Sequence, residues 1–511
     1  MELVTAPAPN PTDYAQANSV PALRRLNEIA AVLLLTSASI AIHGYHPFVE
    51  DGEIYVPGIK KLLNPELYPF NDGFFASHAK LTLFPNLIAW SVRITELPLE
   101  WALLLWQFAC IFMLLMACWK LGLVCFGNSR AALGSAGLVG SLLTVPVAGT
   151  ALYILDQYVN PRCFSTAASV WVVVSVLQRK YVQAFLWLLF TVLIHPLMAV
   201  FSLAFAGILL WIQYATSGVR LQFVPALALF PPVTNAYRMT LDSRPYFFLL
   251  RWQWYEWLGI FAPLLILWWF ASLARRREQQ LLESLCWAAI VFGILGFVAA
   301  VVITVPSSMA RFAELQPLRC LQLIYILLFA VSGAWLAQNV FKAKLWLWLG
   351  LFVPLCAGMF YAQRQLFPAT AHLELPGVRS SNVWVEAFVW ARDHTPVKAY
   401  FALDPEHMRL HGEDQHGFRA IAERSMLADA AKDSGAVTMF PALAATWLEQ
   451  VNAQAHWKTF ILADFLNLHQ TYGVDWVVLR QPGVSGLDCP YANSAVLVCH
   501  IALRGSGAEA R

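Results

Sequence analysis

The feature that most constrains this chain is a series of long apolar stretches separated by charges, prolines or glycines. Each is long enough, or nearly so, to cross a bilayer, whose core needs about 20 apolar residues in a helix. The chain is 59% hydrophobic and 13% charged, far from the ~25% charged residues of soluble proteins. We predict an α-helical polytopic membrane protein of about eleven spans, at 26–43, 98–119, 131–154, 163–178, 181–195, 196–214, 221–236, 257–274, 284–304, 318–340 and 345–363.

The fifth and sixth stretches form one apolar run from Tyr181 to Tyr214, interrupted at His195-Pro196. The run is too long for one comfortable span, and proline disrupts a helix interior. We therefore predict a hairpin at His195-Pro196. If the run were a single span instead, every later loop would change side.

Basic residues indicate the orientation, because short cytoplasmic loops retain Lys and Arg. With the N-terminus inside, every predicted inner loop is basic, through Arg24-Arg25, Lys120 with Arg130, Arg179-Lys180, Arg220, Arg275-Arg276-Arg277, and Lys342 with Lys344. We expect a multi-pass protein of the inner (plasma) membrane, with a cytoplasmic tail at 1–25, a transmembrane domain at 26–364 and a large outer loop at 44–97. Residues 365–511 would then lie on the periplasmic or extracytoplasmic side.

Residues 365–511 regain charged and His residues, and short extended runs alternate with helical ones. We predict a small α/β domain from strands at 398–403, 474–479 and 495–501 and helices at 384–393 and 442–450. Cys489 and Cys499 bracket a turn-like segment, so in an oxidising compartment they could form a disulfide. Two free core thiols are the alternative.

The first outer loop concentrates acidic residues directly after the first span, at Glu50, Asp51 and Glu53. A carboxylate at a membrane surface can act as general base toward an acceptor hydroxyl, or hold a divalent cation against a phosphate. Asp51 also precedes a predicted short helix at 53–63, where an Asp can simply cap the backbone. Catalysis and capping are therefore both open for Asp51, and the metal requirement is unknown.

Two further groups lie at predicted outer ends of spans. Asp156 and Arg162 stand between the third and fourth spans, where ionisable groups are costly unless paired or functional. A simple mutual ion pair is the alternative. His195 could transfer a proton or contact a phosphate, although a lone His on an apolar face is often a hydrogen-bonded structural residue.

Arg311 and Arg319 stand at the outer mouth of the tenth span. The planar guanidinium suits phosphate because it donates two parallel hydrogen bonds and keeps its charge. These arginines could hold the phosphate of a lipid-linked donor. Snorkelling toward lipid headgroups, together with an Arg311–Glu314 pair, is the alternative.

Glu50, Asp51 and Tyr55 follow the first span in a large outer loop, and about eleven spans precede a C-terminal outer domain. In this motif and this architecture the chain resembles the GT-C superfamily. The segments 394–402 and 418–425 also resemble outer domains of bacterial GT-C-like membrane proteins whose reaction is not settled. The resemblance implies transfer of a sugar from a polyprenyl-phosphate donor, with Glu50 and Asp51 catalytic.

Three functions follow as hypotheses. The favoured one is inverting glycosyl transfer at the outer face, with Tyr55, Asp156, Arg162, His195, Arg311 and Arg319 binding substrate. Its partners would be a polyprenyl-phosphate-linked sugar, membrane lipid and an unknown acceptor. A transporter or flippase, and a non-catalytic assembly subunit, are the alternatives. The net charge of +3 with scattered Lys and Arg excludes a nucleic-acid footprint.

Overall fold

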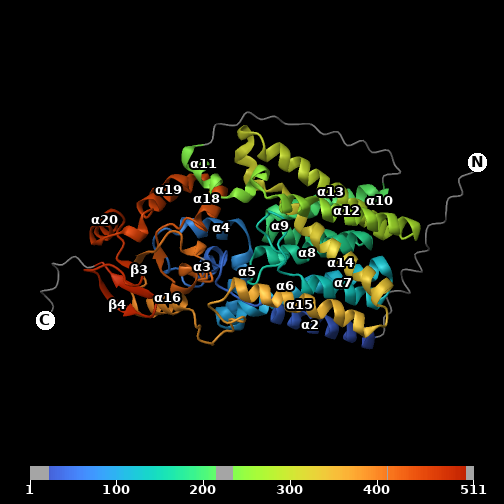
Figure 1. Cartoon of the computed structure of the whole chain (residues 1–511), viewed down its shortest axis with the longest axis horizontal. Coiled ribbons are helices and arrows are strands. Elements are labelled where there is room, and N and C mark those ends of the chain that lie inside the picture. The colour runs from blue at the N-terminus through green and yellow to red at the C-terminus, as the bar shows by residue number, and fades with distance from the viewer. Residues whose placement is uncertain (1–21, 215–233, 411, 502–511) are drawn as a thin grey trace, which may run out of the picture.

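The computed structural model describes residues 22–214, 234–410 and 412–501. Its helices lie side by side in a bundle at one end of the molecule, and a mixed sheet with helices around it forms the other end (Figure 1). The two ends differ in composition as expected, because the bundle contains the apolar stretches and the sheet lies in the polar C-terminal part.

Seven helices in the described residues are long and apolar enough to cross a membrane. They correspond to α2 (Ala22–His43), α6 (Leu99–Phe126), α10 (Pro196–Tyr214), α12 (Trp254–Arg276), α13 (Gln280–Thr304), α14 (Leu321–Leu336) and α15 (Leu345–Leu366). Two shorter apolar helices, α8 (Pro161–Leu177) and α9 (Tyr181–Ile194), lie beside them. The prediction of a polytopic helical architecture is confirmed, although about eleven spans were expected.

Some predicted spans agree with the observed helices and others do not. The hairpin at His195-Pro196 is confirmed, because α9 ends at Ile194 and α10 begins at Pro196. The stretch at 131–154 is not one helix: α7 (Ser129–Ser141) ends early, and turns lead to α8. Pro146 explains the break, since proline lacks an N–H and pushes the preceding residue out of the helical region. The stretch at 221–236 lies almost wholly outside the described residues.

The bundle is closely packed where small residues meet. On α7 and α14, Gly134 and Gly333 face each other so closely that a Cβ on either would overlap the backbone oxygen of the other. Small residues allow membrane helices to approach in this way and gain packing contacts. This crossing fixes α7 against α14 and so holds the turns after α7 at one end of the bundle.

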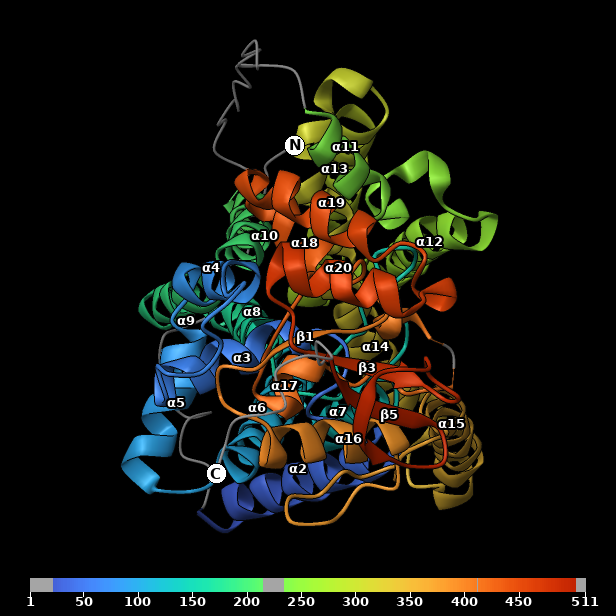
Figure 2. The ribbon, with the colours of Figure 1, turned by 90° about the vertical axis from the view of Figure 1, so that its left-hand side faces the viewer.

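The large outer loop folds into three helices, α3 (Gly52–Leu63), α4 (Gly73–Leu81) and α5 (Phe84–Thr95). They lie between the bundle and the C-terminal part (Figure 1), and seen from the C-terminal end they lie to one side of the sheet (Figure 2). Long-range hydrogen bonds join this loop to the C-terminal part: Tyr68 donates to the Arg419 carbonyl at 2.9 Å, and Asn71 donates to the Tyr400 hydroxyl at 2.7 Å. The outer loop is therefore the layer that connects the two ends.

The C-terminal part combines a five-stranded sheet with surrounding helices. Its strands are β1 (Tyr400–Ala402), β2 (Ser425–Met426), β3 (Trp476–Arg480), β4 (Asp488–Ala492) and β5 (Val496–His500), in the order β2-β1-β3-β5-β4. The β1–β2 and β1–β3 pairs are parallel, and the others are antiparallel. The helices are α16 (Val383–His394), α17 (Phe418–Ala422), α18 (Asp433–Met439), α19 (Ala444–Ala453) and α20 (Leu462–Tyr472).

This arrangement confirms the predicted α/β fold, and three strands and two helices lie close to their expected positions. Cys489 on β4 and Cys499 on β5 are joined by a disulfide, as one of the two sequence alternatives proposed. The antiparallel register of β4 and β5 brings the two cysteines together, since Asp488 pairs with His500.

Candidate functional site

Asp51 stands at the turn between α2 and α3, where the outer loop meets the bundle. It occupies the position before α3, but its side chain makes no capping hydrogen bond. Its carboxylate accepts hydrogen bonds from Arg162 instead. The preceding residue, Glu50, has a left-handed backbone with φ of 53°, which is costly for a residue with a side chain and clusters at functional sites. Helix capping therefore does not account for the Asp51 carboxylate.

Arg162 lies between two carboxylates. Its Nη1 and Nη2 each donate to Oδ2 of Asp51 at 3.0 Å, and Nη2 also donates to Oδ2 of Asp156 at 2.9 Å. The expected Asp156–Arg162 pair is present, and it extends to Asp51. A planar guanidinium can hold two carboxylates at fixed positions, which a flexible ammonium cannot. Arg162 thus joins the outer loop to the bundle.

Local sequence explains how Arg162 reaches this place. Asn160 caps α8 by accepting from the Cys163 N–H at 3.1 Å, and Pro161 occupies the first helical turn, where its missing N–H costs nothing. The Asn160 amide also donates to Oδ2 of Asp156 at 2.6 Å. The Asn-Pro pair starts α8 directly before Arg162 and aligns Asp156 with it.

Lys432, in the C-terminal part, completes the cluster, and it was not among the residues predicted from the sequence. Its Nζ donates to Glu50 and lies 3.4 Å from Oδ1 of Asp51. Lys432 is buried and directly precedes α18. No local pattern marks it, because its partners lie 382 and 381 residues earlier in the chain. We call Glu50, Asp51, Asp156, Arg162 and Lys432 the acidic cluster.

Charges within the acidic cluster keep Asp51 and Lys432 ionised. Burial by itself would raise the pKa of Asp51, but Lys432 and Arg162 outweigh it and hold that pKa well below its usual range. Burial would lower the pKa of Lys432, but Glu50 and Asp51 outweigh it and raise that pKa to about 12. At neutral pH the Asp51 carboxylate is therefore an anion with two fixed cationic partners.

Two tyrosines border Asp51. The Tyr158 hydroxyl accepts from the Asp51 N–H at 3.3 Å, which fixes the turn before α3. Tyr55 lies four residues after Asp51 on α3, and burial raises its pKa to about 12; Arg162, Asp51, Arg319 and Asp156 also act on it electrostatically. Tyr55 therefore lies within electrostatic range of both the acidic cluster and Arg319.

Arg319 and His195 approach the same region from other helices. Arg319 belongs to η5 (Pro317–Cys320), and its buried Nε has no hydrogen-bond partner among the described residues. His195, between α9 and α10, interacts electrostatically with Arg319 and Arg162. A guanidinium with an unpaired N–H near this cluster can bind an anionic ligand, because it keeps its positive charge and donates hydrogen bonds.

Arg311 occupies a different contact. It lies on η4 (Ser307–Leu315) with its guanidinium 5.7 Å from the Phe312 ring centre. The neighbouring Glu314 accepts a 3.4 Å hydrogen bond from Tyr237, whose hydroxyl also donates to the Thr438 carbonyl at 2.9 Å. This contact joins η4 to the C-terminal part. The two arginines that sequence reasoning paired thus lie in different surroundings.

A buried charge network supports the acidic cluster. Glu53, two residues after Asp51, accepts from the backbone N–H groups of Arg419 and Ala420 at 3.1 and 3.0 Å. The Arg419 side chain forms a fork with Asp433, with hydrogen bonds of 2.9 and 2.7 Å. Both side chains of that pair are 1% exposed. Since Asp433 follows Lys432, the network holds Lys432 and Asp51 in one frame.

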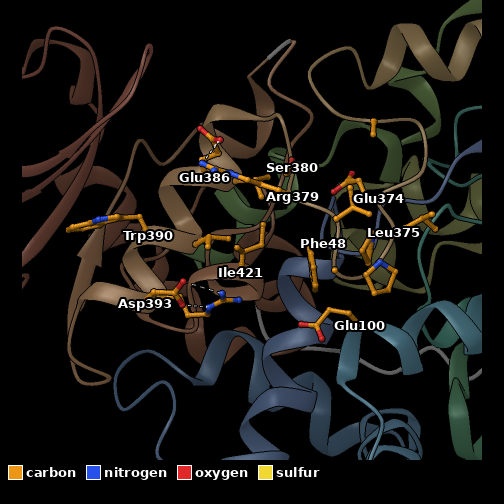
Figure 3. A pocket seen from close by; sticks show the side chains of 18 of the residues that line it. Phe48, Glu100, Glu374, Leu375, Arg379, Ser380, Glu386, Trp390, Asp393 and Ile421 are labelled. Atoms are coloured by element: carbon orange, nitrogen blue, oxygen red, sulfur yellow. Dashed lines mark hydrogen bonds and ion pairs between the residues drawn. The ribbon is translucent and has the colours of Figure 1, made fainter.

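A separate cavity of about 580 Å³ opens between α16, the segment 371–380 and the start of α6. Paired charges lie at its wall: Arg379 with Glu386, both labelled in Figure 3, and Arg392 with Asp393. Phe48, Ile421 and other apolar side chains also line it. It includes no member of the acidic cluster, so we do not assign the reaction to it.

The acidic cluster does not suit a divalent cation. Calcium and magnesium take several free oxygen ligands, but Arg162 binds Asp51 and Asp156, and Lys432 binds Glu50. Across residues 22–214, 234–410 and 412–501, no group of three His, Cys, Asp or Glu side chains is arranged to hold a metal. The carboxylates already have cationic partners from the chain itself.

Comparison with known proteins gives matches among solved structures alone. No family model matches the chain, and no curated protein sequence matches it. The apo structure of the Archaeoglobus fulgidus oligosaccharyltransferase is 11% identical, with a TM-score of 0.46; the match covers 89% of this chain and 69% of that one.

Two further structures of Archaeoglobus fulgidus oligosaccharyltransferase match similarly. One is AglB in complex with an inhibitory peptide and a dolichol-phosphate, at 12% identity and a TM-score of 0.47, covering 90% of this chain and 70% of that one. The other is a complex with Zn and sulfate, at 12% identity and a TM-score of 0.39, covering 88% and 68%. At these identities and TM-scores, the three matches assign no family, no residue role and no reaction to this chain.

Proposed function

We propose that this chain is a GT-C-like glycosyltransferase that moves a sugar from a polyprenyl-phosphate donor to an acceptor hydroxyl at the outer face of the membrane. One observation carries the proposal: the ionised Asp51 carboxylate is held by Arg162 and Lys432 near Arg319, whose Nε has no hydrogen-bond partner in the described residues. An acceptor for a proton and a donor for an anion therefore lie close together, as group transfer from a phosphate requires.

The proposed reaction is a displacement with inversion at the anomeric carbon. The acceptor oxygen forms a bond to that carbon, while the bond from the carbon to the phosphate oxygen breaks. The bonding electrons leave with the phosphate, whose charge the Arg319 guanidinium stabilises. The proton of the acceptor hydroxyl passes to Asp51.

The lowered pKa of Asp51 limits how this transfer can proceed. A weakly basic carboxylate does not deprotonate a free alcohol. Glycosyl transfer passes through an oxocarbenium-like transition state, and the hydroxyl becomes strongly acidic once its oxygen bonds to the anomeric carbon. Asp51 therefore orients the hydroxyl first and takes its proton late.

The remaining residues position these groups. Arg162 fixes the Asp51 carboxylate, and Asp156 fixes Arg162. Tyr55 and His195 lie within electrostatic range of Arg162 and Arg319, and we assign them to binding of the sugar-phosphate. The apolar bundle beside Arg319 would take the polyprenyl chain.

The test compares Asp51→Asn with the wild type, both as full chains in lipid nanodiscs. The measured quantity is the release of polyprenyl phosphate from a polyprenyl-phosphate-linked sugar. Asn preserves the shape of Asp51 but cannot take up the proton. We expect turnover to fall by about 100-fold or more, with normal folding and insertion. Asp72→Asn is the matched control, because Asp72 precedes α4 in the same loop and pairs with Lys61 at 2.7 Å.

Full turnover in Asp51→Asn would overturn the catalytic role of Asp51. Sugar-lipid that crosses the bilayer intact, with no release of polyprenyl phosphate, would instead favour the flippase. Equal losses in both Asn variants would point to a general disturbance of the loop.

A further inference from the structure

We infer that Arg162 and Lys432 take the place of a divalent cation at the acidic cluster, so that glycosyl transfer there requires no metal, with Lys432 as a positioning residue. The part of this inference that concerns turnover rests on the proposed function. It goes beyond the GT-C resemblance, which left the metal requirement open.

The geometry places one cation on each side of the Asp51 carboxylate. Arg162 donates twice to Oδ2 at 3.0 Å, while the Lys432 ammonium lies 3.4 Å from Oδ1. Both carboxylate oxygens thus face a positive group. A metal ion bound to Asp51 would have to approach beside two fixed cations, whose repulsion is strong in a partly buried site.

The neighbouring carboxylates are also engaged. Glu50 pairs with Lys432, and Oδ2 of Asp156 accepts from both Arg162 and Asn160. Three carboxylates and two cations leave the cluster with one net negative charge, before the substrate phosphate and Arg319 are added. Hard divalent cations favour clusters of free anionic oxygens, which this arrangement does not offer.

Lys432 is held in place by contacts that are independent of Asp51. Its backbone N–H donates to Oδ1 of Asp429 at 2.5 Å. The adjacent Asp433 is fixed by Arg419, which also interacts with Glu53 on α3. Arg244 donates to the neighbouring Ala431 carbonyl at 2.5 Å. A lysine anchored in this way is a preorganised charge, as a positioning residue should be.

The first experiment measures metal binding without any substrate. The full-length protein is treated with EDTA, exchanged into buffer and titrated with Mn²⁺, and the bound ion is followed by electron paramagnetic resonance. We expect the wild type to show no site that depends on Asp51. Lys432→Met removes the ammonium and should create an Mn²⁺ site about 10-fold tighter or more than the residual Mn²⁺ binding of the wild type, and adding Asp51→Asn should abolish that site.

The matched control is Lys398→Met, which changes an exposed lysine of the same domain and should leave Mn²⁺ binding unchanged. A stoichiometric Mn²⁺ site in the wild type that Asp51→Asn removes would overturn the inference. This outcome is decided whether or not the chain transfers sugars. If Lys432→Met does not fold, the wild-type titration alone still decides the question.

The second experiment measures turnover. EDTA-treated wild type should keep its full rate, and added Mg²⁺ or Mn²⁺ should not raise it. Lys432→Met should lose about 10-fold or more, whereas Lys432→Arg, which keeps the charge, should recover most of the rate. A rate restored by metal in EDTA-treated wild type would overturn the inference and leave the proposed transferase function intact. If the wild type shows neither sugar transfer nor an Mn²⁺ site, the proposed function is refuted. The inference that Arg162 and Lys432 take the place of a divalent cation would still stand.

Discussion

Arg162 donates two hydrogen bonds of 3.0 Å to the same oxygen of Asp51, a residue 111 positions earlier in the chain. This pair joins the start of α8 to the start of α3, so the bundle directly orients the candidate catalytic carboxylate. Its consequence is that the function of Asp51 depends on the shape of Arg162 as well as on its charge.

Arg162→Lys tests that dependence, because lysine keeps the charge but loses the planar fork. One ammonium cannot hold both Asp51 and Asp156 in their present orientation. We expect turnover to fall by about 10-fold or more, with a smaller change in thermal stability. Arg179→Lys, in the exposed turn directly after the same helix, is the control. Equal rates in the two variants would mean that the fork does not matter.

Arg319→Gln removes the proposed donor to the leaving phosphate. A hydrogen bond to a charged group contributes about 1.5–3 kcal/mol, so the KM for the lipid-linked donor should rise by about 10-fold or more. Inhibition by free polyprenyl phosphate should weaken in parallel. Arg276→Gln, at the exposed end of α12, should change neither value. Unchanged inhibition in Arg319→Gln would exclude a phosphate contact there.

The lowered pKa of Glu374 should make the stability of the fold depend on pH. It accepts from His46 at 2.6 Å and from His416 at 2.9 Å, joining the end of the first span to the C-terminal part. Burial would raise its pKa, but His416 and His46 outweigh it and lower that pKa to about 2. A carboxylate with a lowered folded pKa stabilises the fold above its unfolded pKa, and this contribution disappears as the pH falls toward 2.

The melting temperature of the wild type should therefore decrease between pH 5 and pH 3. Glu374→Gln should melt lower at pH 6 and show a shallower dependence over that interval. Glu406→Gln, in an exposed pair with Arg409, is the control. Parallel pH profiles for wild type and Glu374→Gln would contradict this role for Glu374.

Orientation in the membrane remains a prediction from the basic loops. Helix α12 is about 34 Å long at 1.5 Å per residue. Arg277, at its C-terminal end, is therefore a full helix length away from its N-terminal end, which follows α11 (Asn235–Asp242) in the chain. A reporter fused after residue 365 should be active only outside the cytoplasm, and one fused after Arg277 only inside. A cytoplasmic signal from the first fusion would show that one span was assigned wrongly.

Local patterns account for what could be predicted. Apolar runs marked nearly every long helix, and His195-Pro196 marked the hairpin, because span length and proline act within a few residues. Local patterns also found Asp51, Asp156 and Arg162, since charges at the ends of apolar spans are conspicuous. The early end of α7 was missed because Pro146 lies inside an otherwise apolar stretch.

By itself, the sequence determined the class of protein, most of its helices, the α/β character of the C-terminal part and the acidic residues of the first outer loop. Only the tertiary structure decided which charges meet. It brought Lys432 to Glu50 across 382 residues and placed Arg319 within electrostatic range of Asp51 and Tyr55, whereas Arg311 lies against the Phe312 ring. The reason is physical: helix and strand formation depend on neighbours in the chain, whereas an ion pair depends on how distant elements pack.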